Sequence, residues 1–412
     1  MNEDRSIRRV LQVHTRYRLA GGEDQVVEAE RRLLEEAGVE VHQIIFDNAD
    51  LRESRSVAGD LGLAASAVWS RSAQRRVEAA IVAKRPQVMH VHNTFPAASP
   101  SVYATAAAYG VPVIQTLHNY RFVCPAATAF RDGHACTDCV GRSIPWPAVL
   151  HACVRGSRPQ SFVAATTLTI HRARGTFARG ISGYVALTSF QRNLMIDGGL
   201  PAERIRVIPN FLEPDPGVQS ESRGGVLFVG RLSHEKGIAV LLEAAKVLPR
   251  VVRFIGGGPL ASDVQKADAL GDVSYLGSVA RPSVIHELRR TIALVLPSVW
   301  FEGFPLVVLE AFATGTPVIA SRIGSLTELI EGGVNGLLAE PNNAVDLADR
   351  IRWAIDHPDE MRAMGLAARQ SYETLFRGAT HLAALQEAYA SVGGNGRSSE
   401  GADMERPGDG AA

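Results

Sequence analysis

Short apolar runs alternate with amphipathic stretches along the first half of the chain. Four of these runs have the length and composition of buried strands, namely Arg8–His14, Val39–Phe46, Gln87–Val91 and Val111–Leu117. After the first run, Asp24–Ala37 places its apolar residues at helical spacing and ends at Gly38. Strands that alternate with helices in this way form parallel, doubly wound sheets. The first half is therefore predicted to be a Rossmann-like domain.

The alternation restarts after a loop that is rich in proline, glycine, serine and acids. This loop, FLEPDPGVQSESRGG, follows Arg206–Pro209 and has the composition of a linker between domains. Further strand patterns follow at Gly225–Gly230, Val251–Ile255, Val273–Leu276, Ala293–Pro297 and Pro317–Ala320. Helical patterns occupy Gly237–Leu248, Pro282–Arg290, Pro305–Ala313, Asp346–His357 and Asp359–Ala390. These patterns predict a second Rossmann-like domain.

The expected fold is α/β, with two Rossmann-like domains that face each other across a cleft. We expect a first domain at residues 7–210, a linker at 211–224, a second domain at 225–374, a helix at 375–392 that crosses back to the first domain, and a disordered tail at 393–412. In open parallel sheets, ligands bind outside the carboxyl ends of the strands. The loops at those ends are therefore where functional residues are expected.

The composition is that of a globular protein of two domains. Hydrophobic residues make up 46% of the 412 residues, and 43 basic residues balance 43 acidic ones. No segment approaches the roughly 20 consecutive apolar residues of a membrane span. The N-terminal segment has no long apolar run before a small-residue cleavage site, so the chain is expected to stay in the cytoplasm.

One segment departs from this balance of charges. Residues 139–196 contain no acidic residue, and arginines are interleaved there with aromatic residues: Arg142, Arg155, Arg158, Arg172, Arg174, Arg179 and Arg192 with Trp146, Phe162 and Phe177. The segment is either a solvated helical face or a surface that meets an anionic lipid headgroup or a phosphorylated acceptor, at the inner face of the membrane. Zero net charge and the lack of a nucleic-acid-binding motif argue against nucleic acid as a partner.

Two loops that follow predicted strands carry residues suited to anionic ligands. Gly21 and Gly22 stand directly before a helix, where free backbone N–H groups attract anions, although a tight strand-to-helix turn explains them equally. Arg231 and Lys236 lie in GRLSHEKG between glycines. A planar guanidinium and a point-charge ammonium at this spacing can converge on one diphosphate.

Two glutamates flank a break in a later strand-to-helix connection. In WFEGFPLVVLEAF, residues 300–312, Glu302 lies in the loop and Glu310 lies on the helix that Pro305 begins. Backbone N–H groups at that helix start can bind phosphate, and an ionised carboxylate accepts hydrogen bonds from hydroxyl pairs of a ribose or a hexose. Together the residues predict a nucleotide-sugar site, whereas either glutamate alone is explained by capping or solvation.

The spacing E-x₇-E after a strand, with GRLSHEKG upstream and a Rossmann-like domain in front, resembles the retaining GT-B glycosyltransferases of family 4. The resemblance covers about residues 7–390, and AGGEDQVV at 20–27 and LHNYRFVCP at 117–125 are similar to a bacterial subgroup linked with polysaccharide and other glycoconjugate assembly. It implies the GT-B fold, no cofactor for catalysis, and transfer of a hexose from a nucleoside-diphosphate sugar to a hydroxyl acceptor with retention.

The resemblance also implies roles for residues of the second domain. Arg231 and Lys236 would neutralise the donor diphosphate, Glu310 would bind the ribose, and Glu302 would bind the donor sugar. The main chain after Glu302 would line the sugar and the phosphates, at Gly303, Phe304, Pro305 and Leu306. The loop that would border the base contains Ser278 and Val279.

In the first domain, the resemblance implies that His118 reaches the donor sugar and that Gly21 and Gly22 close over the reaction centre. Asn119 stands where similar enzymes often have aspartate, so that contact stays open. The implied catalytic set is His118, Arg231, Lys236 and Glu302. No obvious pair of facing carboxylates is present, which favours front-face attack assisted by the leaving phosphate over a hydrolase-like mechanism.

Several alternatives share these features. An epimerase would act on the nucleotide-sugar without an acceptor, and a binding protein would not act on it at all; a product assay separates them from a transferase. The acid-free segment favours an acceptor that is lipid-linked and anionic, while transfer to a soluble natural product stays open.

The four cysteines lie within thirty residues, at Cys124, Cys136, Cys139 and Cys153. Disulfides are not expected in a cytoplasmic chain. The spacing C-x₁₁-C-x₂-C-x₁₃-C suits a structural zinc site with four thiolate ligands, and buried or incidental thiols are the alternative.

Overall fold

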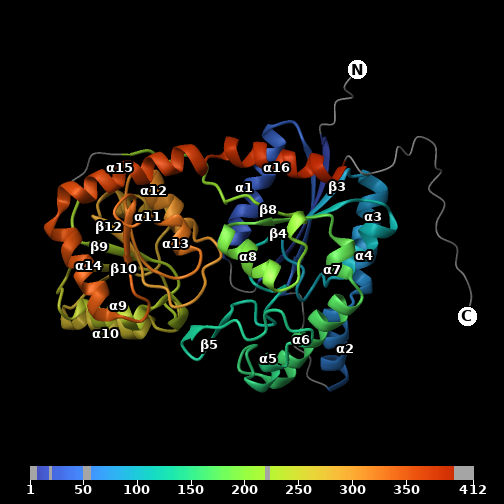
Figure 1. The fold of residues 1–412 in the computed structure, drawn as a ribbon, viewed down its shortest axis with the longest axis horizontal. Coiled ribbons are helices and arrows are strands. Elements are labelled where there is room, and N and C mark those ends of the chain that lie inside the picture. The colour runs from blue at the N-terminus through green and yellow to red at the C-terminus, as the bar shows by residue number, and fades with distance from the viewer. Residues whose placement is uncertain (1–6, 18–20, 50–56, 219–222, 394–412) are drawn as a thin grey trace, which may run out of the picture.

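The computed structural model describes residues 7–17, 21–49, 57–218 and 223–393. Within them the chain forms two parallel six-stranded sheets covered by helices, and the two units lie side by side along the long axis of the molecule (Figure 1). The predicted α/β fold with two Rossmann-like domains is confirmed. The tail predicted to be disordered lies outside the described residues except for Gly393.

The N-terminal sheet has the strand order β2-β1-β3-β4-β7-β8, and its strands run parallel. They are β1 (Arg9–Arg16), β2 (Glu40–Asp47), β3 (Val88–Val91), β4 (Val113–Leu117), β7 (Gly183–Ala186) and β8 (Ile205–Val207). Strands β3, β4 and β7 are buried along their whole length, as expected for inner strands of a parallel sheet. The apolar runs predict β1 to β4 within two residues and do not predict β7 and β8.

Helices cover this sheet and fill the connections between its strands. They are α1 (Gly22–Glu36), α2 (Val57–Val68), α3 (Arg71–Lys84), α4 (Ser101–Ala108), α5 (Trp146–Leu150), α6 (Arg158–Ala173), α7 (Thr176–Gly180) and α8 (Ser189–Asp197). A short hairpin, β5 (Phe130–Arg131) with β6 (His134–Ala135), lies between β4 and α5. The hairpin and α5 project at the end of the domain opposite α16 (Figure 1).

The C-terminal sheet has the order β11-β10-β9-β12-β13-β14. Its strands are β9 (Val226–Val229), β10 (Val252–Ile255), β11 (Ser274–Tyr275), β12 (Ala293–Leu296), β13 (Val318–Ser321) and β14 (Gly336–Ala339). Its helices are α9 (Ile238–Ala245), α10 (Ala261–Leu270), α11 (Arg281–Arg289), α12 (Leu306–Ala313), α13 (Leu326–Leu329) and α14 (Ala344–Asp356). Helix α12 begins one residue later than predicted, because Pro305 has extended backbone angles and is its N-cap residue.

The stretch Asp359–Ala390 is helical as predicted, but it forms two helices with a break between them. They are α15 (Pro358–Leu375) along the C-terminal domain and α16 (Gly378–Gly393) across the N-terminal domain (Figure 1). At the break, the Phe376 carbonyl accepts a hydrogen bond from the Leu212 N–H over 3.0 Å. Tyr389 of α16 is buried in the N-terminal core, so the end of the chain completes the first domain.

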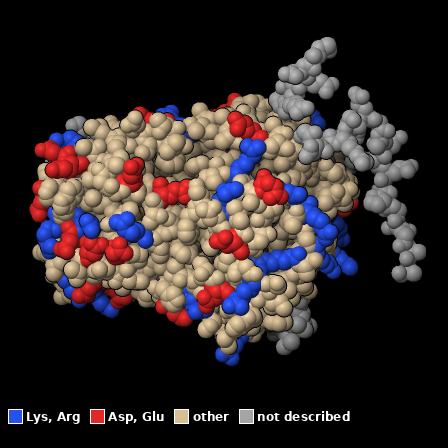
Figure 2. Space-filling model, viewed as in Figure 1, with Lys and Arg blue, Asp and Glu red and all other residues tan. Residues whose placement is uncertain are grey.

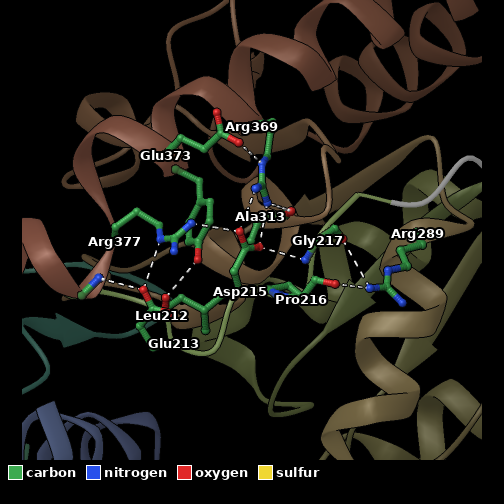
Figure 3. Close-up of polar contacts among 12 residues, drawn as sticks. Leu212, Glu213, Asp215, Pro216, Gly217, Arg289, Ala313, Arg369, Glu373 and Arg377 are labelled. Carbon is green, nitrogen blue, oxygen red and sulfur yellow. Dashed lines mark hydrogen bonds and ion pairs between the residues drawn. The ribbon is translucent and has the colours of Figure 1, made fainter. Parts of the chain in front are cut away.

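Ion pairs tie the linker to the α15–α16 junction (Figure 3). Arg369 of α15 donates from both terminal nitrogens to the Asp215 carboxylate, over 2.8 and 2.7 Å. Arg377 donates to Asp215 over 3.0 Å and to Glu213 over 3.1 Å. The two places where the chain crosses between domains are therefore joined to each other.

No helix among the described residues combines the length and the hydropathy that crossing a membrane requires.

Candidate active site

The carboxyl ends of the two sheets face each other and touch. The Tyr120 hydroxyl, after β4, donates to the Glu302 carbonyl, after β12, over 3.0 Å. The hydroxyls of Thr188, after β7, and Ser325, after β13, lie 2.9 Å apart. The loops that the sequence marks as functional in each domain therefore meet at one place.

Glu302 is a buried, ionised carboxylate at this place, only 3% exposed. Lys236 Nζ donates to both of its oxygens over 2.8 Å, and Ser298 Oγ donates to Oε1 over 2.6 Å. Burial alone would raise the pKa of Glu302, but the charge and hydrogen bonds of Lys236 and then Ser298 lower it. The indole N–H of Trp300 also favours the ionised form, without a hydrogen bond of good geometry. Three hydrogen bonds, two from Lys236 and one from Ser298, thus occupy three of about four lone-pair positions on the carboxylate.

Close backbone approach explains two glycines around this ion pair. Gly237 has φ of +71°, and a Cβ there would lie 1.8 Å from the Pro297 carbonyl oxygen, so only glycine lets the Lys236 turn pack against the end of β12. A Cβ at Gly303 would lie 2.9 Å from the His118 carbonyl oxygen. The loop after Glu302 is therefore pressed against the loop of the other domain.

The remaining donor-site candidates lie in a row along the C-terminal sheet edge. Arg231, after β9, is exposed and forms no hydrogen bond or ion pair with the part of the chain that the structure describes. Ser278 and Val279, after β11, are exposed as well. A Cβ at Gly257 would lie 3.0 Å from Ser278 Oγ, so the loops after β10 and β11 are neighbours. The strand order β11-β10-β9-β12 aligns these loops with Glu302.

Glu310 lies on α12 and is paired in this structure. Arg281 Nε, from α11, donates to its Oε1 over 2.8 Å. Burial raises the pKa of Glu310, and the charge of Arg281 offsets part of that increase. A ribose hydroxyl at Glu310 would therefore enter beside Arg281, which sequence analysis did not identify.

The start of α12 contributes main chain more than side chains. Phe304 is 8% exposed and packs in the C-terminal core, so its side chain is unavailable to a ligand. Leu306 lies across the domain interface from Gly22, where an added Cβ would be 3.2 Å from its Cδ1. Gly22 therefore lies against the start of α12.

His118, after β4, is paired with a second histidine. Its Nε2 lies 2.9 Å from Nδ1 of His92, which follows β3. Burial lowers the pKa of His92 to about 4 and the pKa of His118 well below its usual value. Both rings are therefore neutral at pH 7, and a single N–H joins them.

Polar groups also surround the other ring nitrogen of His92. Gln12 Nε2 lies 3.2 Å from His92 Nε2, and a Glu30 carboxylate oxygen lies 3.4 Å from it. Gln12 Nε2 also donates to the Val27 carbonyl and to Glu30, each over 3.3 Å. His118 is therefore connected through His92 to a buried group of polar side chains in the first domain.

A buried carboxylate holds this histidine group in place. Glu30 of α1 is 1% exposed; its Oε1 lies 2.9 Å from His90 Nδ1 and its Oε2 lies 3.3 Å from His381 Nε2 of α16. Burial would raise the pKa of Glu30, but the histidines hold it well below the usual value. Ligand atoms of Glu30, His90 and His92 lie within 4.8 Å of one another, a spacing that a metal could use. Both ring nitrogens of His90 already have hydrogen-bond partners, however, which favours a hydrogen-bonded core.

The start of α1 is capped as a tight turn. Asp24 accepts from the Gly21 N–H over 3.1 Å, and its other oxygen lies 2.8 Å from His14 Nε2. The neighbouring Glu23 accepts from Asn93 Nδ2 over 2.8 Å, and burial raises its pKa. Glu23 is thus a half-buried carboxyl on the side of the first domain that faces the candidate site, and the sequence pattern did not single it out.

Buried polar atoms without a hydrogen-bond partner gather at the same strand ends. Most buried polar groups in proteins are satisfied. Several unsatisfied atoms of the described residues lie at the ends of strands β1, β2, β4 and β12 or in the loops directly after them. They are His14 Nδ1, Thr15 Oγ1, Asn48 Oδ1, Arg121 Nε and Trp300 Nε1. Unmet hydrogen-bonding capacity of this kind is expected where a polar ligand binds.

The four cysteines are together but apart from these residues. Cys124, Cys136, Cys139 and Cys153 are free thiols that line one small cavity beyond the end of β4. Burial, and then the neighbouring Cys124, raises the pKa of Cys139 to about 12. Sequence spacing therefore identified a true spatial cluster.

Models of two glycosyltransferase families match consecutive parts of the chain. A model described as "Glycosyl transferase 4-like domain" matches residues 21–210, and one described as "Glycosyl transferases group 1" matches residues 215–371. The two matches cover both sheets except strand β1, and they include the loops that meet between the sheets.

Individual proteins are also similar to this chain in sequence or in fold. An uncharacterized glycosyltransferase of Methanocaldococcus jannaschii is 35% identical over 34% of this chain and 40% of its own length. Glycogen synthase of Mycobacterium tuberculosis is 28% identical over 75% of this chain and 69% of its own length. The crystal structure of Anabaena HepE in complex with UDP superposes with a TM-score of 0.65 over 93% of this chain and all of that one, at 19% identity.

Proposed function

Because the chain belongs to the family 4 glycosyltransferases of the GT-B fold, we propose that it transfers a hexose from a nucleoside-diphosphate sugar to a hydroxyl acceptor. Residues 225–374 hold the donor in this proposal, and residues 7–210 hold the acceptor. The observation that carries it is the Lys236–Glu302 ion pair at the point where the two domains meet, with His118 on the opposite side.

The cations of the second domain suit the leaving diphosphate. Arg231 is exposed and without a partner among the described residues, so its planar fork is free for phosphate oxygens. Lys236 has three N–H groups and uses two on Glu302, which leaves one for the same anion. Fixed positive charge at the leaving group is the main electrostatic contribution that such a transfer needs.

The opposite wall offers a neutral imidazole. With its Nε2 bound to His92, His118 has Nδ1 left for a hydrogen bond with a sugar hydroxyl, and it adds no charge beside the developing oxocarbenium ion. On the side of the C-terminal domain, Glu302 has one lone-pair position left, which can accept a hydrogen bond from another sugar hydroxyl.

Transfer proceeds with retention in this proposal, through front-face attack assisted by the leaving phosphate. Incubating the protein with a donor and an acceptor and determining the anomeric configuration of the product by NMR tests both claims. An inverted linkage would exclude retention, and turnover of the nucleotide-sugar without acceptor to another nucleotide-sugar would show an epimerase instead.

Donor binding should depend on Glu310. UDP-, GDP- and dTDP-sugars are the donors to screen, and UDP is the first because the similar HepE structure contains it. A donor at about 100 times its Kd stabilises the fold by ~2.7 kcal/mol, which thermal shift detects. We expect Glu310→Ala to weaken nucleotide binding by about ten-fold, the value of a charged hydrogen bond.

The matched control for this measurement is Glu287→Ala. Glu287 also pairs with an arginine, Arg253, in the same domain, but near the amino ends of the strands. Its loss should leave nucleotide affinity unchanged. Equal affinity in the Glu310 variant and the wild type would count against the proposed ribose contact.

The acceptor is lipid-linked and anionic in this proposal, and the chain meets the inner face of the membrane through the hairpin, α5 and the start of α6. The large apolar side chains exposed there are Ile144, Trp146, Leu150 and Phe162. The Arg142 guanidinium lies 5.5 Å from the Trp146 ring centre, and Figure 2 shows basic side chains outnumbering acidic ones over the N-terminal domain, on the right of the view. Exposed apolar groups beside arginines suit an anionic lipid surface.

Vesicle sedimentation tests this surface. The protein should bind vesicles that contain phosphatidylglycerol and not pure phosphatidylcholine vesicles, and binding should weaken with salt. The double variant Trp146→Ala/Phe162→Ala should bind roughly ten-fold more weakly, because it removes apolar area. Leu270→Ala removes a side chain that is 79% exposed on the other domain and should have no effect. Binding that is equal in both variants would refute the contact.

A further inference from the structure

The segment between β4 and α6 holds an unusual backbone with little regular structure. Residues 124–157 contain the two-residue strands β5 and β6 and the five-residue helix α5. Its non-glycine residues with left-handed φ are Ala127, Ala129, Asp132, Ala152 and Arg155. Each such residue costs on the order of 1 kcal/mol and persists only where the surroundings fix it. Short elements of this kind cannot fix it alone, because they bury little apolar surface.

The four cysteines come from separate parts of this segment and converge. Cys124 follows β4, Cys136 follows β6, Cys139 lies three residues further on, and Cys153 precedes α6. All four line one cavity whose other walls are almost entirely apolar, formed by Val123, Phe130, Val140, Pro147 and Ala148. The cavity therefore offers sulfur as its main ligand chemistry.

The one charged side chain at this cavity is engaged elsewhere. Arg131 donates to Asp138 over 2.8 Å and to Asp132 over 3.1 Å. Its charge is neutralised by these carboxylates, so it does not oppose a cation among the sulfurs. No disulfide joins any of the four cysteines.

We propose that Cys124, Cys136, Cys139 and Cys153 bind one structural zinc ion as a four-thiolate site. Zinc prefers four ligands in a tetrahedron with Zn–S bonds of about 2.3 Å, and a C-x₂-C pair supplies two adjacent ligands. Among the described residues, Glu30, His90 and His92 are the only group with three ligand atoms within 4.8 Å of one another. The four sulfurs are therefore further apart than that, and they draw closer when the ion binds. Segments without long helices or strands allow that movement.

A zinc ion at this site would connect residues 124–157 to the loop that follows β4 and carries His118. Cys124 N–H donates to the Tyr120 carbonyl over 2.8 Å, and Tyr120 N–H donates to the Ala127 carbonyl over 3.0 Å. Tyr120 in turn holds the Glu302 carbonyl from the other domain. Zinc at Cys124 would therefore fix the loop that carries His118 as well as residues 124–157. The zinc site itself does not depend on the proposed reaction.

Metal analysis of the full chain, purified without a histidine tag under reducing conditions, tests the site. We expect one zinc ion per chain. Cys124→Ser and Cys153→Ser should each lose it, because a three-thiolate site binds far less tightly, whereas Val140→Ala, which changes the same cavity without removing a sulfur, should keep it. Stoichiometric iron with acid-labile sulfide would overturn the identity of the metal.

A second measurement on the unmodified chain covers the case in which the cysteine variants fail to fold. After chelation, titration with Co²⁺ should give the intense visible absorption of a tetrahedral cobalt–thiolate centre, saturating at one ion per chain and abolished by Zn²⁺. All four thiols should react quickly with a thiol reagent only in the metal-free chain. Absence of both zinc in the isolated chain and cobalt uptake would overturn the proposal.

Discussion

In the Glu302→Gln variant we expect kcat to fall by about 100- to 1,000-fold, the usual effect of removing one preorganised charge from a transition-state site. The buried Glu302 carboxylate holds Lys236 through two hydrogen bonds of 2.8 Å. Glutamine keeps the shape but not the charge, so the ammonium loses its fixed position and the sugar loses an ionised acceptor. Initial rates over a range of donor concentrations separate the effect on kcat from an effect on KM.

The control for Glu302 distinguishes lost chemistry from lost folding. The single variant leaves Lys236 without its counter-charge and should unfold more easily by a few kcal/mol, as broken buried ion pairs do. The double variant Lys236→Met/Glu302→Gln removes both charges, so it should regain stability but not activity. Glu287→Gln alters an ion pair away from the site and should leave kcat unchanged. A Glu302 variant with wild-type kcat would exclude the proposed role.

Acid should destabilise the N-terminal domain, and His92 alone should account for about 3 kcal/mol of the loss between pH 6.5 and pH 4. Burial lowers the pKa of His92 from 6.5 to about 4. Between these values the unfolded chain binds a proton that the folded chain does not, so the free energy of unfolding decreases as the pH falls. Above pH 6.5 the group contributes nothing to the pH dependence.

Urea unfolding at a series of pH values measures this slope. The His92→Gln variant should show a smaller slope of unfolding free energy against pH between pH 6.5 and 4, whatever the stability of the variant at pH 7. The control variant His151→Gln, at an exposed position, should keep the wild-type slope. Glu30 adds a second loss below pH 4.5, because its pKa is lowered in the folded chain and its unfolded carboxylate takes up the proton first. An unchanged slope in the His92 variant would show that this imidazole is not the titrating group.

The part of the candidate site in the C-terminal domain could be predicted from sequence because its residues are local. Glu302 and Glu310 follow from one strand, one break and one helix, and the structure places Glu302 in the loop after β12 and Glu310 on α12, with Pro305 as the N-cap of that helix. The Lys236–Glu302 pair spans 66 residues and was not predicted, although both residues lie in loops that follow the adjacent strands β9 and β12. Local pattern and sheet topology together define this edge.

The part of the candidate site in the N-terminal domain depends on contacts that no local pattern encodes. His92 matters because β3 lies beside β4, which puts it 2.9 Å from His118. The only signal was HVHN at 90–93, two histidines at strand spacing at the end of an apolar run. Arg281 reaches Glu310 from a different helix, and nothing around either residue indicates the pairing. Tertiary packing decides these cases.

The acid-free segment contains both exposed and buried residues. Arg142, Trp146 and Phe162 are exposed, as a contact surface requires. Phe177 is buried in the core, and Arg172 donates to the Phe122 carbonyl over 2.8 Å, so these residues support the fold. The sequence alone cannot separate the two groups, because burial depends on the packing of α6 and α7.

The ion-paired linker and α15–α16 junction have a mechanical consequence. The linker and the junction are bound to each other at one edge, so a rotation of one domain about that edge would keep these ion pairs and would break contacts between the facing loops, such as the one from Tyr120 to the Glu302 carbonyl. The hairpin and α5 lie at the opposite edge (Figure 1). Such a rotation would therefore move the hairpin and α5 further than it moves Asp215.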